Sequence, residues 1–365
     1  MARVTLVGSG VVLGTLYLAT AEQTIIFGLA ALAAIAAISM YFPTVAVTGF
    51  VVIVVTNAAD IATDFHGAPP IGGIFVPCLL ILLLLRRAFG LEDLTTSVYL
   101  LVPVGLYLTI NALGLLWVDG PSPTVDYVSG LIRNLTIVVV LCGFVTTRAR
   151  FRAVVMAVGF SAAGLAAVST FQYATGTFSS AYFGFATARV RNIAGATYTW
   201  RLEGPLPDPN FFAQLLVMSL PVVAALAFAA RPLIFRIAAL IGVPLMAVSI
   251  FFTFSRGGLV GFVGIAVVAA LLARHRLPIA MAFLATVVVS VLAIPTLYFD
   301  RLLPIVGAAE SMLNGSQAIA DSALAQRLMV NRAGIAIFEN SPFFGIGAGQ
   351  FQYNYDSYAL AHGLD

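Results

Sequence analysis

The chain consists of long apolar runs separated by short polar segments. About eleven of these runs approach the ~20 apolar residues that an α-helix needs to cross the hydrocarbon core of a bilayer, and short loops join most of them. The pattern predicts an all-α fold, a polytopic transmembrane helical bundle. The runs lie at roughly 4–20, 24–41, 43–59, 71–86, 97–117, 126–146, 153–171, 209–230, 237–254, 257–273 and 278–299.

The composition is typical of a membrane protein. Of the 365 residues, 61% are hydrophobic and 9% are charged, whereas a soluble globular domain carries about 25% charged residues. The net charge of +3 is spread over many segments, and a nucleic-acid-binding protein would instead concentrate its basic residues on one face. Cys78 and Cys142 fall inside apolar runs without metal-ligand spacing, so we interpret them as small core residues.

Arginines in the short loops predict the orientation. Cytoplasmic loops carry an excess of Lys and Arg, and four arginine clusters each close one apolar run or open the next. With all four clusters in the cytoplasm, the spans alternate along the whole chain. The clusters are Arg86-Arg87, Arg148/Arg150/Arg152, Arg231/Arg236 and Arg274/Arg276, which places 58–70, 118–125, 172–208, 255–257 and everything after 300 outside.

We expect two parts in the chain. Residues 1–299 form the helical bundle, with an extracytoplasmic loop at about 172–208, and residues 300–365 form a second outer loop. The first span ends in Ala19-Thr20-Ala21, a pattern like a signal-peptidase site, which leaves its cleavage open. The second loop holds a stretch that reads as an amphipathic helix, with Leu324, Leu328, Ile335 and Phe338 opposite Arg327, Asn331 and Arg332.

A glycine-rich segment follows that stretch. Ser341-Pro342 predicts the end of the helix, and the glycines of 345–349 predict a tight turn that lets the backbone pack closely. The same glycines resemble part of a dinucleotide-binding loop. They follow a helix and a proline rather than a strand, however, so the nucleotide interpretation fails its structural context.

Four arginines stand out because they lie on the predicted outer face and outside the orienting clusters: Arg201, Arg256, Arg327 and Arg332. A charged side chain at a membrane boundary is costly unless it is paired or functional, and the planar guanidinium suits bidentate contact with phosphate oxygens. Arg201 precedes Pro209-Asn210, where a predicted helix start offers free N–H groups to an anion. We interpret the set as an anionic-ligand site. A snorkelling anchor is the alternative for each arginine taken singly.

Histidines supply the remaining candidates. His362, in the second outer loop, could act as a general base, because imidazole accepts a proton near neutral pH. An idle solvent-exposed residue is the alternative. Asp60, Asp64 and His66 gather in the first outer loop, where a solvated loop surface explains them more simply than a metal site.

Three segments carry motifs that occur together. Arg201–Asn210 has an arginine, a glycine and a Pro-Asn pair before a helix, Thr253–Gly258 has the pattern T-x-S-R-G, and Ser341–Phe351 has the pattern S-P-x-x-G-x-G-x-G-x-F. In order and spacing they resemble the O-antigen ligase and polymerase family of bacterial envelope membrane proteins.

The resemblance implies a glycosyltransferase of the GT-C type, without a metal or other cofactor, in the bacterial cytoplasmic (inner) membrane with its active face outside. Such an enzyme moves a glycan from a polyprenyl-diphosphate carrier, such as undecaprenyl diphosphate, to a hydroxyl on a glycan or lipid acceptor. The implied role of Arg201, Arg256 and Arg327 is to bind the diphosphate and stabilise the charge of the leaving group. Asn210 and Arg332 are the further substrate-binding candidates, and His362 is the catalytic one.

The chain departs from the family pattern at one point. The family has a histidine, usually followed by asparagine, late in the outer loop and further spans after it, whereas His362 is followed by Gly-Leu-Asp. We therefore expect a chain truncated before the final spans. The alternative function is a transporter or flippase-like carrier that binds an anionic solute through the same arginines, although no internal repeat supports it.

Overall fold

The fold is mostly helical, as predicted, with one added β-hairpin. The computed structural model describes residues 37, 40–68, 72–91, 95–118, 120–194, 197–229, 232–272 and 322–361. The helices and strands are α3 (Pro43–Val55), α4 (Ala58–Asp60), η1 (Ile61–Phe65), α5 (Gly72–Ala88), α6 (Thr95–Leu113), η2 (Gly114–Leu116), α7 (Ser122–Phe144), α8 (Arg148–Thr175), η3 (Tyr182–Gly184), β1 (Thr187–Ala194), β2 (Thr197–Gly204), α9 (Pro209–Ala229), α10 (Leu233–Phe252), α11 (Arg256–Leu272), α14 (Ser322–Asn340) and α15 (Phe351–Ala361).

Four of the described helices are long and apolar enough to cross a membrane: α7, α8, α9 and α10. They coincide with the predicted runs 126–146, 153–171, 209–230 and 237–254, so these four predictions are confirmed. A fifth span results if the bent pair of α3 with α4 and η1 counts as one. The predicted runs 4–20 and 278–299 lie outside the described residues, and the total of eleven spans stays a prediction.

The predicted run 43–59 differs from the structure. Helix α3 ends at Val55, and the chain bends by 73° into the segment Ala58–Phe65. Asn57 at the bend has a φ of 55°, a left-handed conformation that asparagine adopts more readily than most residues. Its side-chain amide donates a hydrogen bond of 3.2 Å to the carbonyl of Pro205, so a contact distant in sequence holds the bend in place.

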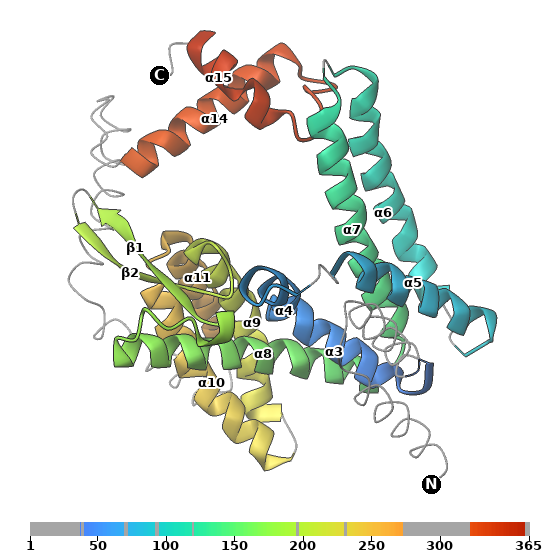
Figure 1. Ribbon diagram of the computed structural model, residues 1–365, viewed down its shortest axis with the longest axis vertical. Coiled ribbons are helices and arrows are strands. Elements are labelled where there is room, and N and C mark those ends of the chain that lie inside the picture. The colour runs from blue at the N-terminus through green and yellow to red at the C-terminus, as the bar shows by residue number, and fades with distance from the viewer. Residues whose placement is uncertain are drawn as a thin grey trace, which may run out of the picture.

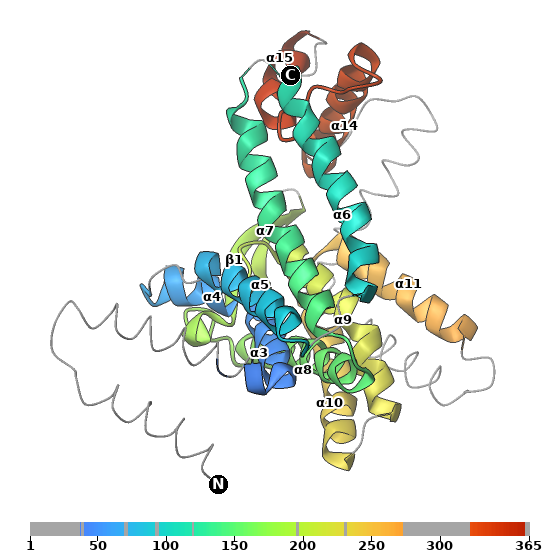
Figure 2. The same cartoon turned by 90° about the vertical axis from the view of Figure 1, so that its right-hand side faces the viewer.

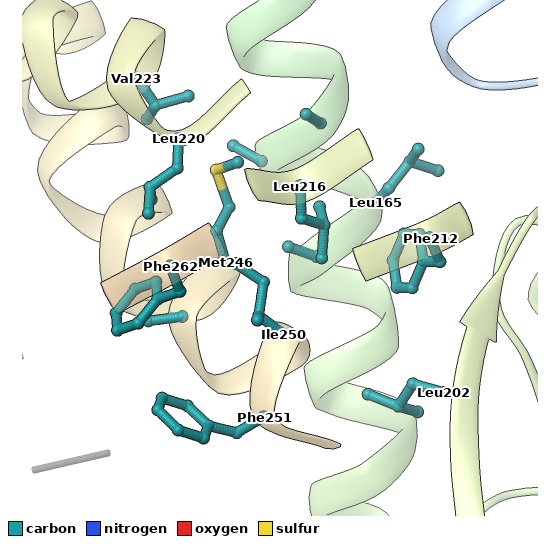
Figure 3. Close-up of a cluster of buried hydrophobic side chains, with 14 of the residues drawn as sticks. Leu165, Leu202, Phe212, Leu216, Leu220, Val223, Met246, Ile250, Phe251 and Phe262 are labelled. Atoms are coloured by element: carbon teal, nitrogen blue, oxygen red, sulfur yellow. The ribbon is translucent and has the colours of Figure 1, made fainter. Parts of the chain in front are cut away.

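The core of the bundle lies where α8, α9 and α10 pack together. Leu216, Leu220, Met246 and Ile250 are fully buried there among other apolar side chains (Figure 3). Polar bonds also join the helices, because Ser249 donates a hydrogen bond of 2.9 Å from α10 to the Ala166 carbonyl of α8. Small side chains and interhelical hydrogen bonds are the usual means of association between membrane helices.

The segment 172–208, predicted only as an outer loop, contains the antiparallel hairpin of β1 and β2. Gln172, near the end of α8, fixes the segment that leads from α8 into the hairpin. Its buried amide donates hydrogen bonds to the carbonyls of Ser180 (2.7 Å) and Ala186 (3.0 Å). Figure 1 shows the hairpin beside α8, α9 and α11. The hairpin segment and the core of α8, α9 and α10 are therefore one packed unit.

The last two helices lie away from this unit. α6 and α7 run side by side, and α14 and α15 lie at the end of this pair that is farthest from α9 and α10 (Figures 1 and 2). Helix α14 ends at Asn340, directly before Ser341-Pro342, as predicted. The stretch is helical as predicted; Ala333, Ala336 and Ile337 are its buried side chains, whereas Ile335 and Phe338 of the predicted apolar face are exposed.

The close approach of α9 and α11 gives a first testable prediction. A Cβ atom on Gly258 would lie 2.7 Å from the Cβ of Ala213, whereas one on Gly257 would meet nothing within 4 Å. We expect Gly258→Ala to lower the free energy of unfolding by about 1–3 kcal/mol, the usual cost of overpacking. Thermal unfolding in detergent measures this change. Gly257→Ala is the matched control, and equal effects of the two substitutions would contradict the packing described.

Candidate functional site

The site centres on Arg201, which is 5% exposed on β2. Its Nε donates a hydrogen bond of 2.7 Å to the carbonyl of Thr253, the C-cap residue of α10. A terminal guanidinium nitrogen lies 3.5 Å from the Asn210 amide oxygen, a long contact. A cation at a helix C-terminus satisfies an otherwise unpaired carbonyl and interacts favourably with the helix dipole. Arg201 thus joins the first and second motifs.

The turn from Thr253 to Gly258 links α10 to α11. Phe254 is fully buried with a φ of 50°, a conformation uncommon for a bulky residue. The Thr253 hydroxyl accepts a hydrogen bond of 3.2 Å from the Ser255 N–H, and the Ser255 hydroxyl accepts one of 3.2 Å from the Gly258 N–H. Serine is a favoured N-cap because it satisfies such a donor. The turn therefore places half-buried Arg256 as the first residue of α11.

The third part of the site is the start of α9. The Asp208 carboxylate accepts a hydrogen bond of 2.6 Å from the Asn210 N–H, and Pro209 occupies the first helical position, where the lack of an N–H carries no cost. Gly204 has a φ of 60°, and a Cβ there would lie 2.5 Å from the Phe212 ring. This fit sets the hairpin directly on α9. Arg201 and Asn210 belong to the first motif and Arg256 to the second. The structure brings the first motif into contact with the turn that carries Arg256.

Sequence reasoning missed a group of charges on the same hairpin. Arg189 lies directly opposite Arg201 in the strand register, and Glu203, two residues after Arg201, is fully buried. The Nε of Arg191 donates a hydrogen bond of 2.7 Å to one Glu203 oxygen, and the Nε of Arg189 forms an ion pair of 3.2 Å with the other. Alternation along the strands could have identified this face, because residues at i and i+2 point to the same side.

These charges leave the hairpin face positive. Arg189, Arg191 and Arg201 stand against the single carboxylate of Glu203. A buried carboxylate is costly unless it is paired, and here it fixes two guanidinium groups through their Nε atoms. The Arg189 side chain is 64% exposed. The exposed guanidinium groups can therefore attract an anion from the solvent while the Glu203 carboxylate stays paired.

The other predicted site residues are not placed at this face. Arg332 is exposed on α14, which packs against α15. The side chain of Arg327 and the whole of His362 lie outside the described part of the structure. Asp60 and Asp64 are exposed, and His66 lies with its Nε2 3.1 Å from the Phe183 carbonyl oxygen. Among the described residues, no three His, Cys, Asp or Glu side chains gather to hold a metal.

The glycine-rich segment 345–349 forms the close turn that the sequence predicted. It packs on the loop between α6 and α7, where a Cβ on Gly349 would lie 2.7 Å from the Pro123 carbonyl oxygen. Buried Gln350 donates hydrogen bonds to the Gly120 carbonyl (2.9 Å) and the Thr124 hydroxyl (3.1 Å). The third motif is therefore a docking element between distant helices.

Comparison with known proteins supports the predicted resemblance. Residues 241–364 match the family model of the O-antigen ligase. This match over the last third of the chain supports a relationship to the O-antigen ligase and polymerase family. The match covers the Thr253–Gly258 turn and the Ser341–Phe351 segment, two of the three motifs on which the resemblance was based, whereas Arg201 lies before it. No curated protein and no solved structure matches the chain.

The match of residues 241–364 supports a glycan-transferring function of the O-antigen ligase or polymerase type. Together with the apolar helices, it supports a multi-pass membrane protein. The predicted resemblance to this family is confirmed.

The charge group on the β1–β2 hairpin yields a second prediction. Removing one partner of a buried ion pair costs about 3–5 kcal/mol, because it leaves an uncompensated charge, whereas an exposed pair contributes about 0–1 kcal/mol. Arg191→Ala should therefore destabilise the protein more than Arg189→Ala, since the Arg191 side chain is 37% exposed and that of Arg189 64%. Glu203→Ala removes the buried carboxylate while Arg191 keeps its hydrogen bond of 3.2 Å to the Pro207 carbonyl, so we expect an intermediate effect. Thermal unfolding measures all three, and a larger effect of Arg189→Ala would contradict the assignment.

The glycine turn yields a third prediction. Gly345 and Gly349 both have positive φ, so alanine is strained at either position, but a Cβ at Gly345 meets nothing within 4 Å. We expect Gly349→Ala alone to detach the turn from the α6–α7 loop. Trp117 donates a hydrogen bond of 3.2 Å to the Gly345 carbonyl, so its fluorescence in a Trp200→Phe background reports the detachment as a red shift. The same shift in Gly345→Ala would argue against a steric cause.

Proposed function

We propose that the chain is an extracytoplasmic glycosyltransferase, a ligase or polymerase, that moves a glycan from a polyprenyl-diphosphate carrier to a hydroxyl acceptor. In this proposal the diphosphate binds at the face formed by the hairpin and the start of α11. The observation that carries it is the 2.7 Å hydrogen bond from the Arg201 Nε to the Thr253 carbonyl. This bond joins the strand that carries Arg201 to the turn that carries Arg256.

The charge balance of this face supports an anionic ligand. Three hairpin arginines stand against one glutamate, and Arg256 follows three residues after the Thr253 carbonyl. Guanidinium groups bind phosphate oxygens in pairs of parallel hydrogen bonds. A diphosphate offers several such oxygens at once. The Arg201 Nε is hydrogen-bonded to the C-terminal end of α10. We therefore assign Arg201 two roles, to hold the hairpin against the α11 turn and to contact the ligand.

The proposed reaction is a displacement at the anomeric carbon of the donor glycan. The acceptor hydroxyl oxygen forms a bond to that carbon, the bond from the carbon to the diphosphate oxygen breaks, and the diphosphate keeps the bonding electron pair. The acceptor proton passes to a base, for which we propose His362. The leaving group gains negative charge in the transition state, and preplaced guanidinium groups stabilise that charge. Arginines can thereby serve the purpose for which other transferases use a metal ion.

The remaining assignments extend this proposal. Arg327 and Arg332 on α14 would contact the diphosphate or the glycan, and Asn210 would orient the Arg201 guanidinium from the start of α9. The GT-C architecture, the polyprenyl carrier and the cell-envelope location with the site outside the cytoplasmic membrane all belong to the proposal. The match of residues 241–364 favours transfer over the alternative of an anionic-solute carrier.

Arg256→Ala is the decisive variant. We expect it to reduce glycan transfer by about 10²–10³-fold, the usual loss when one preorganised donor to a developing negative charge is removed. Transfer from a lipid-diphosphate-linked glycan to an acceptor measures the effect. Membrane insertion and thermal stability should persist, because Arg256 begins its helix and leaves the Ser255 cap intact.

Two further variants make the Arg256 test specific. Arg256→Lys keeps the charge but loses the planar fork, so it should recover only part of the activity. Arg148→Ala at the exposed start of α8 removes an arginine outside the proposed site and should leave transfer unchanged. Full activity in Arg256→Ala would refute the proposed site, and solute flux through liposomes without glycan transfer would favour the carrier.

A further inference from the structure

Helix α7 carries an arginine at the middle of a candidate membrane span. Arg133 lies eleven residues from each end of the helix, Ser122 and Phe144, and α7 is one of the four described helices long and apolar enough to cross a membrane. Roughly 16 Å of helix separates Arg133 from either end, which is farther than its side chain extends when it snorkels toward the head groups. An ionisable residue in such a position is costly, and it usually marks a functional site.

Polar residues form a seam along the same face of α7. Ser122, Asp126 and Ser129 precede Arg133 at spacings of four, three and four residues, and Thr136 follows three residues later. These spacings define one face of a helix. The first four residues of the seam are exposed, and Thr136 is half-buried. The polar groups therefore extend from the start of the span to just beyond its middle.

The same face of α7 is closed beyond Thr136. Val140 and Phe144 continue the seam at spacings of four residues, and both are buried in a cluster with apolar side chains of α3 and α5. Gly143 packs so closely there that an added Cβ would collide with the Leu83 side chain of α5. This face of α7 therefore points into packed protein at one end and is open at the other, where the helix starts.

The Arg133 guanidinium has space around it. Within the described part of the structure it forms no salt bridge or hydrogen bond, and Asp126 lies seven residues away, roughly 10 Å along the helix. The hydroxyls of Ser129 and Thr136 are donated to carbonyls of α7 itself. An added Cβ on Gly130, one turn before Arg133, would meet nothing within 4 Å. Among these residues, the arginine thus lacks a counter-charge and has room for a ligand.

We propose that the seam lines a water-filled passage from the start of α7 to Arg133, and that Arg133 binds an oxyanion such as phosphate there. Water in the passage hydrates the guanidinium, which hydrocarbon cannot do. The planar guanidinium binds an oxyanion through paired hydrogen bonds. Helical side chains lean toward the N-terminus of their helix, which for Arg133 is the open end of the passage. This site does not depend on the transfer reaction proposed above.

Cysteine accessibility tests the passage. The whole chain in lipid nanodiscs, with Cys78→Ala and Cys142→Ala, receives one new cysteine at a time and is treated with water-soluble methanethiosulfonates. We expect Ser129→Cys and Thr136→Cys to react several-fold faster than Val138→Cys, the matched control, because Val138 is also exposed but lies on the opposite side of α7. Equal rates at the three positions, or no reaction at the two seam positions, would overturn the passage.

The charge of the reagent tests the attraction for anions. At Ser129→Cys, an anionic methanethiosulfonate should react several-fold faster than a cationic one, after each rate is divided by its rate with a free thiol in solution. Arg133→Gln should abolish this preference, whereas Arg133→Lys keeps the charge and should retain it. A preference that persists in Arg133→Gln, or that is absent with Arg133 in place, would contradict an anion site at this residue.

Protection measurements identify the source of the oxyanion. Inorganic phosphate should slow the reaction of Ser129→Cys several-fold while Arg133 is present and have no effect in Arg133→Gln. If phosphatidylglycerol in the nanodisc protects in place of free phosphate, the ligand is a lipid head group, and the site still stands. Protection by neither, or equal protection in Arg133→Gln, would refute the binding of an oxyanion.

Arg256→Ala separates this site from the proposed function. It should leave the reagent preference at Ser129→Cys unchanged, whatever its effect on glycan transfer. If the preference disappears in Arg256→Ala, the attraction belongs to the α11 turn and the site at Arg133 fails. If the preference persists while Arg256→Ala transfers glycan normally, the site at Arg133 stands and the proposed transfer site fails.

Discussion

The hydrogen bond between the Arg201 Nε and the Thr253 carbonyl is the contact on which the site depends. It joins residues 52 positions apart and is buried on both sides. Buried backbone carbonyls require a partner, and the C-terminal carbonyls of a helix lack one within the helix. The hairpin therefore satisfies a carbonyl at the C-terminal end of helix α10. A segment that looks like a loop in the sequence is tied to the bundle by the requirements of the backbone.

Glu203 offsets the repulsion between the arginines of the hairpin. Directly opposed like charges destabilise an antiparallel pair, and Arg189 faces Arg201 across the strands. The fully buried Glu203 carboxylate pairs with Arg189 and Arg191 and thereby offsets this repulsion. Its cost of desolvation is offset only while both guanidinium groups remain bound to it. The hairpin can thus concentrate positive charge without losing its register.

Spans and motifs were predictable from the sequence because each depends on local pattern. The limits of α7, α8, α9 and α10 follow from apolar length, and the end of α14 follows from Ser341-Pro342. The hairpin was missed although a local signal exists, because Tyr198, Trp200 and Leu202 alternate with polar residues and two residues, one of them a glycine, separate the strands. The bend at Asn57 and the burial of Glu203 arise from contacts distant in sequence. The side chains of α14 that pack inward, Ala333, Ala336 and Ile337, could not be told from the apolar pattern alone, because two of them are small.

Helix α9 is the common support of everything at the site. The hairpin rests on it where Gly204 meets Phe212, the α11 turn rests on it where Gly258 meets Ala213, and Asp208 caps its first turn. Each contact is too close to admit a larger side chain or is a short hydrogen bond, so the relative positions of Arg201, Asn210 and Arg256 have little freedom. Electrostatic stabilisation of a transition state is most effective when the charges are fixed before the reaction. Tight backbone packing on α9 therefore fixes the positions of the hairpin and of the α11 turn that carry these arginines.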